Sequence, residues 1–270
     1  MGQTDMTERR VTLIQRAGSL ANPCLARRLA KSGHDLVVHA PRAGMVKELL
    51  DLGAAVEVIS QEELPLDGPA SDRTPSGARM LVDRTLARFG RLDSAALLPV
   101  PRNDVGSIRG RLLQAPLDHI NAMGSFLEIT CHLLRAVIPA MQGRGGQILV
   151  FTSDAGARPE AGWSLYGAAR AGQNFLVRAA ALEHACEGIC INAMGSKNAI
   201  TAEFPGCPPG AATDDRVSLG AWSEPLVAET PLGRLGTMEE LAAFACVLLD
   251  GSNRFQTAQY FSFSGGWNSL

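Results

Sequence analysis

The stretch QILVFTSDAGARPEAGWSLYGAARAG, residues 147–172, joins the pattern of a buried strand to the beginning of a helix. Its opening run, residues 147–151, is mostly apolar, as expected for a strand covered on both faces. The Ala-rich run at residues 168–185 predicts a helix, because alanine has the highest helix propensity. A buried strand followed by a long helix is typical of βαβ units, so this stretch predicts an α/β fold.

Three side chains in this stretch combine a hydroxyl, a phenol and a permanent cation. Ser153 follows the predicted strand, and open α/β sheets bind their ligands at the carboxyl ends of strands. Tyr166 and Arg170 are four residues apart in the predicted helix, so both side chains project from one face. A guanidinium favours the phenolate form of a nearby phenol, which makes Tyr166 a candidate general base. The alternative is an ordinary helix surface that carries a tyrosine and an arginine by chance.

The alternation of strand and helix patterns extends along the whole chain. Strands are predicted at residues 11–15, 35–40, 55–60, 93–98, 147–151, 189–194 and 259–263. Helices are predicted at residues 20–30, 43–52, 74–89, 114–141, 166–187 and 237–250. This order predicts a Rossmann-like, doubly wound α/β fold, with a seven-stranded parallel sheet and helices on both faces. The long excursion at residues 196–232 is expected to form a wall of the substrate pocket.

Composition limits the domain organisation and the classes of partner. A chain of 270 residues suits one domain, residues 1–270. The 25 basic and 27 acidic residues give a net charge of −2, which argues against nucleic acid or an anionic membrane as a partner. The 6 cysteines lack paired spacing and predict free thiols in a reducing cytoplasm. The 5 histidines lack metal-binding spacing, so no metal site is expected.

Several motifs together resemble the short-chain dehydrogenase/reductase superfamily over nearly the whole chain. Ser153 lies thirteen residues before Tyr166, Asn121 lies in LDHINAMGSF, and PLGRLGTMEELAAFACVLLD precedes SGGW. In oxidoreductases of this superfamily, the residue four positions after the tyrosine is a lysine that also holds the nicotinamide ribose, but here it is Arg170. The resemblance also implies a homotetramer, in which subunits pair through the two long helices predicted at 114–141 and 166–187.

Other positions depart from the pattern of the dinucleotide-binding members. Only Gly18 remains of the glycine-rich turn that follows the first strand. LLPVP at 97–101 replaces the usual N-N-A-G, residues 195–198 replace the usual P-G, and Ser264 replaces an acidic residue. These departures lead to the expectation that the protein uses no cofactor.

Loss of dinucleotide features with a retained Ser, Tyr and Arg is similar to the halohydrin dehalogenases, and YGAARAG resembles that family. The resemblance implies a cofactor-independent carbon–halide lyase. Tyr166 would take the proton of a vicinal haloalcohol hydroxyl held by Ser153, and the alkoxide would expel halide to give an epoxide. In reverse, a small anion would open the epoxide. The expected partners are therefore a haloalcohol or epoxide and a halide or another small anion.

The same resemblance suggests a pocket. Thr12 and Gly18 match the opening motif of that family, but Ala17 stands where an aromatic residue is expected, which Phe204 or Trp267 could replace. The loop after the sixth strand is expected to bind halide through backbone amides. Asn121 is expected behind the catalytic residues. The expected pocket comprises Thr12, Ala17, Gly18, Gly195, Ser196, Lys197, Asn198, Ala199, Phe204 and Trp267.

Two alternatives remain open at the level of sequence. Arg42, just after the second strand, lies where NADP-binding members carry a basic residue, which favours an NADP-dependent oxidoreductase. Degenerate cofactor motifs also fit an inactive subunit that supports an active partner. Retention of Ser153 and Tyr166 argues against the inactive subunit, because a scaffold needs neither side chain.

Overall fold

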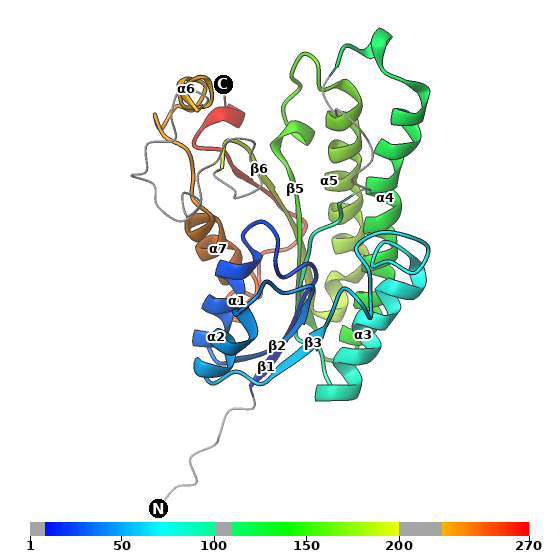
Figure 1. Cartoon of the computed structure of the whole chain (residues 1–270), viewed down its shortest axis with the longest axis vertical. Coiled ribbons are helices and arrows are strands. Elements are labelled where there is room, and N and C mark those ends of the chain that lie inside the picture. The colour runs from blue at the N-terminus through cyan, green and yellow to red at the C-terminus, as the bar shows by residue number, and fades with distance from the viewer. Residues whose placement is uncertain (1–8, 101–109, 200–222, 270) are drawn as a thin grey trace, which may run out of the picture.

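The computed structural model describes residues 9–100, 110–199 and 223–269. Its centre is a parallel sheet in the order β3-β2-β1-β4-β5-β6-β7 (Figure 1). The strands are β1 (Arg10–Ile14), β2 (His34–His39), β3 (Val56–Ile59), β4 (Ser94–Leu97), β5 (Gly146–Ser153), β6 (Ile189–Ser196) and β7 (Tyr260–Phe263). The prediction of a seven-stranded, doubly wound parallel sheet is confirmed.

The helices cover both faces of this sheet. They are α1 (Asn22–Lys31), α2 (Met45–Asp51), α3 (Pro75–Phe89), α4 (Leu117–Val137), α5 (Ser164–His184), α6 (Glu224–Ala228) and α7 (Met238–Val247). In Figure 1, α1, α2 and α7 lie on one side of the sheet and α3, α4 and α5 on the other. None of the described helices combines the length and the apolar character that crossing a membrane requires.

Local signals set several helix boundaries. The Thr74 hydroxyl accepts a hydrogen bond from the Gly77 amide and so caps α3, which begins at Pro75. Gly90 ends that helix in the left-handed conformation, with φ of 69°, which glycine adopts without strain. At α7, Thr237 and Glu240 form a reciprocal capping box.

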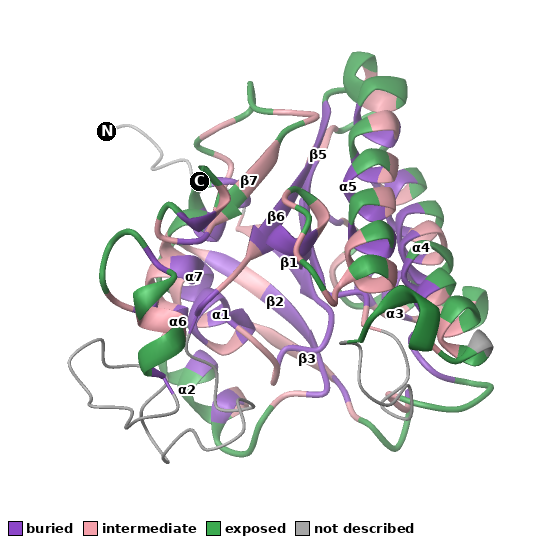
Figure 2. Ribbon diagram, turned by 90° about the horizontal axis from the view of Figure 1, so that it is seen from above, coloured by how far each residue is buried: buried purple, intermediate pink, exposed green. Residues whose placement is uncertain are grey.

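The apolar core lies in two layers, one on each face of the sheet. Successive strand residues point to opposite faces, so Ile14 packs into the layer under α1 and α7, and Leu13 into the layer under α3, α4 and α5. Figure 2 shows that the helix surfaces turned toward the sheet are buried and the outer surfaces exposed. Because helices cover both faces of the sheet, the strands appear in the sequence as continuous apolar runs.

The topology determines where a ligand can bind. Strand order reverses between β1 and β4, and in open α/β sheets this point forms a crevice at the carboxyl ends of the strands. β5 and β6 run further toward this edge than predicted, because their pairing continues to Ser153 and Ser196. Ser196 also pairs with Phe263 of β7. Residues that were expected to begin a loop are therefore part of the sheet.

Candidate active site

The structure brings Ser153, Tyr166 and Arg170 to one region at the carboxyl edge of the sheet. Ser153 ends β5, and its hydroxyl accepts a hydrogen bond of 3.3 Å from the Ala155 amide. Tyr166 lies in the first turn of α5, and Arg170 follows one turn later. The guanidinium carbon of Arg170 lies 5.1 Å from the centroid of the Tyr166 ring. The sequence-based pairing of this phenol with this cation therefore holds in three dimensions.

Arg170 is held at the interface of α4 and α5. Its guanidinium carbon lies 4.0 Å from the centroid of the Phe126 ring, and Nη1 donates a 2.9 Å hydrogen bond to Gln173 Oε1. Gln173 in turn donates to the Phe126 carbonyl at 3.1 Å and to Thr130 Oγ1 at 2.7 Å. Arg170 Nε is buried and has no hydrogen-bond partner within the described residues. The Arg170 guanidinium is thus held against the Phe126 and Tyr166 rings, and its Nε–H donor is unused among the described residues.

Aromatic rings position Tyr166. Its ring meets Phe126 edge-on at 5.7 Å between centroids and lies 5.4 Å from the ring of Trp163. Within the described residues, no hydrogen bond joins the Tyr166 hydroxyl to Ser153 or to another side chain. The phenol is therefore oriented by packing, and its hydroxyl can exchange a proton with a bound ligand.

Asp154, next to Ser153, belongs to a buried polar network that the sequence did not reveal. The carboxylate is fully buried, and it accepts hydrogen bonds from the Tyr260 hydroxyl and, at 2.9 Å, from Ser262 Oγ. Burial raises the pKa of the Asp154 carboxyl above its usual value, and the hydroxyl hydrogen bonds oppose that rise. Burial and the neighbouring Asp154 also raise the pKa of the Tyr260 phenol. The network ties the end of β5 to β7.

Asp154→Asn is expected to change how stability depends on pH. Because the pKa of Asp154 is raised in the folded state, the unfolded chain ionises more readily, and the free energy of unfolding falls as pH rises from the usual carboxyl pKa toward the raised value. The asparagine variant should lack this fall. Urea denaturation between about pH 4 and pH 8 measures the effect. Asp51→Asn, at a carboxylate 63% exposed, is the control, and equal pH profiles for wild type and Asp154→Asn would refute the assignment.

The loop after β6 does not form the halide site that was expected there. The Lys197 amide donates to the Phe263 carbonyl at 3.1 Å, so it is already used by the extended sheet. Lys197 Nζ lies 2.7 Å from Glu160 Oε2, 4.6 Å from the centroid of the Trp267 ring and 5.6 Å from that of Trp163. The ammonium is therefore neutralised and enclosed, and it cannot serve as a free anion ligand.

The other residues of this loop are also engaged in structural contacts. Asn198 is buried with a left-handed φ of 54°, and its side-chain amide donates to Thr230 Oγ1 at 3.0 Å. Ala199 forms a bridge with Gly236. Gly195 lies so close to Ser153 that an added Cβ would be 2.8 Å from the Ser153 carbonyl carbon. Ser196 remains within β6.

The expected pocket residues in β1 and in the turn after it are packed into the framework. Thr12 is inaccessible, and its hydroxyl lies 2.7 Å from His34 Nδ1 and 2.8 Å from Ser94 Oγ. Ala17 is inaccessible within the core. Gly18 packs against the end of β2, where an added Cβ would lie 2.8 Å from the Ala40 carbonyl oxygen. The structure therefore corrects the assignment of Thr12 and Ala17 to an open pocket, whereas Gly18 is partly buried.

Three further residues were expected at the site, namely Asn121, Phe204 and Trp267. Asn121 is exposed on α4, so it does not lie buried behind the catalytic residues. Phe204, and with it most of the 196–232 excursion, lies outside the described residues. Trp267 is 5% exposed and lies beneath both Lys197 and Arg158, whose guanidinium carbon is 4.5 Å from its ring centroid.

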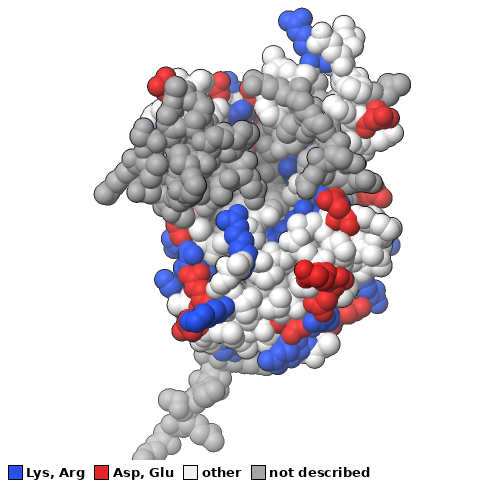
Figure 3. Space-filling model, in the orientation of Figure 1, with Lys and Arg blue, Asp and Glu red and all other residues white. Residues whose placement is uncertain are grey.

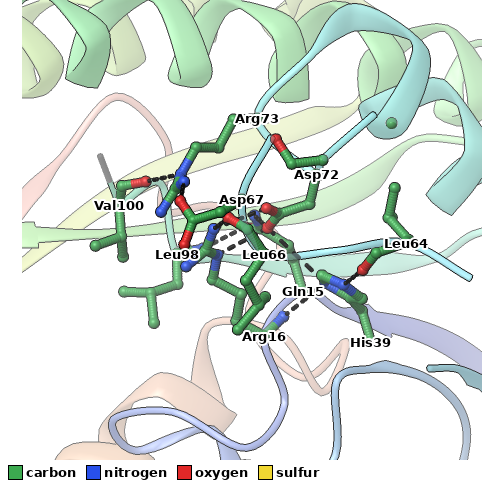
Figure 4. Close-up of polar contacts among 12 residues, drawn as sticks. Gln15, Arg16, His39, Leu64, Leu66, Asp67, Asp72, Arg73, Leu98 and Val100 are labelled. Carbon is green, nitrogen blue, oxygen red and sulfur yellow. Dashed lines mark hydrogen bonds and ion pairs between the residues drawn. The ribbon is translucent and has the colours of Figure 1, made fainter. Parts of the chain in front are cut away.

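The turn between β1 and α1 contains a buried ion pair that no local sequence signal predicts. Arg16 Nη2 and Nε each lie 2.7 Å from the Asp72 carboxylate, which is fully buried (Figure 4). Gln15 donates to the same carboxylate at 2.5 Å. Arg16 and Leu20 have left-handed φ values of 53° and 50°, conformations for which glycine is normally used. The turn therefore keeps a glycine-like backbone although it carries full side chains.

Relatives of known name are dehydrogenases and reductases. The chain is 29% identical over 271 residues to "(2S)-[(R)-hydroxy(phenyl)methyl]succinyl-CoA dehydrogenase subunit BbsC" of Thauera aromatica, covering 95% of this chain and 94% of the relative. It is 28% identical over 266 residues to the 3-oxoacyl-[acyl-carrier-protein] reductase of a Synechocystis species, covering 95% and 96%. A short-chain type dehydrogenase/reductase from Mycobacterium ulcerans has the same fold, with a TM-score of 0.78 at 22% identity over 96% of this chain and 90% of that one.

These relatives correct two expectations from the sequence. The assignment as a carbon–halide lyase is wrong, because the relatives are oxidoreductases by name. The expectation that no cofactor is used is also contradicted, because relatives named as dehydrogenases and reductases point to a nicotinamide cofactor. None of the relatives described above is a dehalogenase, so that finer resemblance finds no support.

A family model covers nearly the whole chain. The model described as Enoyl-(Acyl carrier protein) reductase matches residues 17–268, a range that includes Ser153, Tyr166 and Arg170. The chain therefore belongs to this family of the short-chain dehydrogenase/reductase superfamily.

Proposed function

We propose that this protein is a nicotinamide-dependent oxidoreductase that interconverts an alcohol and a carbonyl compound. The observation that carries the proposal is the placement of Ser153, Tyr166 and Arg170 at the carboxyl edge of the sheet, in a chain whose named relatives are dehydrogenases and reductases. The family relationship alone leaves the reacting residues open, and this placement supports Ser153, Tyr166 and Arg170 as those residues.

Several described residues fit a dinucleotide along the crevice. At one end, Arg42 is exposed after β2, and its Nε donates to the carbonyl of Gly18 in the β1–α1 turn. At the start of α1, Asn22 Oδ1 is buried without a hydrogen-bond partner among the described residues. At the other end, Arg170 Nε is a second buried group without a partner there. Buried polar atoms are normally satisfied, so these atoms suit contacts to a bound molecule.

The charge of this region also suits a phosphorylated ligand. Figure 3 shows a hollow in this face of the molecule, with Lys and Arg atoms visible inside and beside it. The amino end of α1 opens onto the β1–α1 turn, and helix amino ends favour negative charge. Arg42 would contact the adenosine end and Arg170 the nicotinamide ribose, in place of the lysine of related enzymes.

The residues of this chain divide the chemistry among them. The bound dinucleotide supplies or accepts the hydride. Tyr166 donates a proton to the carbonyl oxygen during reduction, or takes it from the hydroxyl during oxidation. Ser153 holds the same oxygen by a hydrogen bond from its hydroxyl, and the Arg170 guanidinium lies against the Tyr166 ring.

Titration calorimetry with NADPH and NADH, followed by assays of hydride transfer to small ketones and acyl thioesters, tests the proposal. Saturable binding of one dinucleotide and its oxidation in the presence of a carbonyl substrate are the expected results. Absence of binding by both dinucleotides would overturn the proposal, because nothing else in the site supplies a hydride.

Arg42→Ala is expected to raise the dissociation constant of NADPH roughly tenfold and to leave that of NADH nearly unchanged. The reason is that a hydrogen bond to a charged group contributes about 1.5–3 kcal/mol, and only NADPH carries the 2′-phosphate. Calorimetry on both ligands measures the two constants. Lys47→Ala, which removes an exposed cation from the neighbouring helix, is the matched control. Equal weakening of both dinucleotides would place Arg42 away from the 2′-phosphate.

A second candidate function is that of a supporting subunit in a dehydrogenase complex. Arg170 is drawn toward Gln173 and the Phe126 ring, and the Thauera aromatica relative is named as a subunit. In this case the purified chain would bind a dinucleotide weakly or not at all and would show no turnover. Replacing Tyr166 with phenylalanine would then leave the activity of the assembled complex unchanged.

Subunits are proposed to pair through α4 and α5 into a homotetramer. Phe175 and Leu182 are 74% and 71% exposed one heptad apart on α5, and Ile120 and Leu127 of α4 are also exposed. Phe175→Glu with Leu182→Glu is expected to reduce the molar mass in solution, because charges oppose burial of this face. Light scattering coupled to size exclusion measures it. Phe255→Glu, at a phenylalanine 94% exposed elsewhere, is the control, and an unchanged mass in the double variant would exclude this interface.

A further inference from the structure

A basic pocket lies at the opposite edge of the sheet from the candidate active site. Its volume is about 210 Å³, and it is lined at the amino ends of β1, β4, β5 and β6. Arg10 begins β1, Arg91 and Asp93 precede β4, Arg144 precedes β5, and Arg254 lies in the segment between α7 and β7. Gln147 and three glycines line the rest, so the arginine side chains dominate its chemistry.

The charges in this pocket do not balance. The lining includes the guanidinium groups of Arg10, Arg91, Arg144 and Arg254 and a single carboxylate, that of Asp93. Asp93 is already engaged, because its Oδ2 accepts from the Val11 amide at 2.8 Å and its Oδ1 from Arg91 at 2.7 Å. One carboxylate cannot balance the charge of four guanidinium groups.

Arg10 shows the consequence of this crowding. Its Nη2 donates to the Gln147 side chain and to the Asp93 carbonyl, the latter at 3.2 Å, while its Nε is buried without a partner in the described residues. Burial lowers the pKa of the Arg10 guanidinium, and the charges of Arg254 and Arg91 lower it further, while Asp93 and Asp250 oppose the change. A partly buried guanidinium beside like charges is stabilised when an anion binds next to it.

We propose that this pocket binds a phosphate group, held between Arg10, Arg144 and Arg254. Guanidinium groups present planar pairs of donors that match the oxygens of phosphate, and the excess positive charge favours a multivalent anion over a chloride ion or a monocarboxylate. The volume is below the roughly 300–1,000 Å³ typical of sites for larger ligands, so inorganic phosphate or the phosphate end of a small metabolite fits better than a nucleotide. The site is independent of the proposed oxidoreductase activity.

The test uses calorimetry and thermal unfolding of the full chain with inorganic phosphate, against chloride at equal ionic strength. We expect saturable phosphate binding and a higher unfolding temperature, since a ligand that binds only the folded state stabilises it. Arg144→Gln with Arg254→Gln should raise the dissociation constant at least tenfold. These two side chains are chosen because Arg10 and Arg91 also bond to Gln147 and Asp93, and their loss would disturb the sheet.

Two control variants separate this site from general charge effects and from the active site. Arg79→Gln removes an arginine that is 75% exposed on α3, and Arg42→Ala acts at the opposite edge. Both should keep the phosphate affinity of the wild type. The proposal is overturned if phosphate stabilises no more than chloride does, or if Arg79→Gln or Arg42→Ala weakens phosphate binding as much as the double variant. A small phosphomonoester, titrated in parallel, shows whether the pocket prefers free phosphate or a phosphorylated metabolite.

Discussion

Asp72→Ala is expected to lower the free energy of unfolding by about 3–5 kcal/mol, the usual cost of removing one partner from a buried ion pair. The carboxylate is inaccessible to solvent and accepts from two nitrogens of Arg16 and from Gln15. Without it, the guanidinium of Arg16, 6% exposed, keeps a hydrogen bond to the Leu66 carbonyl but loses its counter-charge. Chemical denaturation measures the loss.

The matched control for Asp72 is an ion pair in solvent. Asp83→Ala removes the partner of Arg79 on α3, where both side chains are more than half exposed, and should cost less than about 1 kcal/mol. A second test is the combination of Arg16→Met with Asp72→Leu, which should cost less than Asp72→Ala, because it leaves no unpaired charge. If Asp72→Ala and Asp83→Ala destabilise equally, the ion pair does not hold the β1–α1 turn.

Tyr166→Phe is expected to lower the turnover rate by roughly 10²–10⁴, the range that a positioned acid–base group contributes. The variant keeps the ring, and with it the contacts to Phe126, Trp163 and Arg170, so folding and dinucleotide binding should persist. The fall should therefore lie in kcat rather than in the binding constant. Steady-state kinetics with calorimetry separates the two.

The chain offers a natural comparison for this variant, because its only other tyrosine is Tyr260. Tyr260→Phe removes the hydrogen bond to buried Asp154, so it should lower stability while reducing turnover far less than Tyr166→Phe does. Turnover that survives in Tyr166→Phe at nearly the wild-type rate would rule out this phenol as the acid–base group.

The strands and helices could be predicted from the sequence because their signals are local. The apolar runs located all seven strands to within a few residues, and helix periodicity located α4 and α5. The proximity of Tyr166 and Arg170 could also be predicted, since only one helical turn separates them. Their wider environment could not, because the Phe126 ring meets Arg170 only after α4 packs on α5.

Contacts between distant segments account for the errors. Arg16 and Asp72 are separated by 56 positions, and no spacing in the sequence indicates that they meet. Thr12 and Ala17 were assigned to a pocket by resemblance, but Thr12 lies in β1 between two strands and Ala17 packs into the apolar core beyond it. The loop at Lys197 was misjudged because sheet pairing continues to Ser196 and uses the amides expected to bind an anion.

The enclosure of Lys197 by Trp163 and Trp267 has a practical consequence for spectroscopy. Both indoles lie against the same ammonium group, and Trp163 also contacts the Tyr166 ring. Indole emission responds to nearby charge, so a ligand that enters beside Tyr166 and shifts Lys197 should change the intrinsic fluorescence of the protein. The chain therefore carries its own optical reporter at the candidate active site, and ligands can be screened without an extrinsic dye.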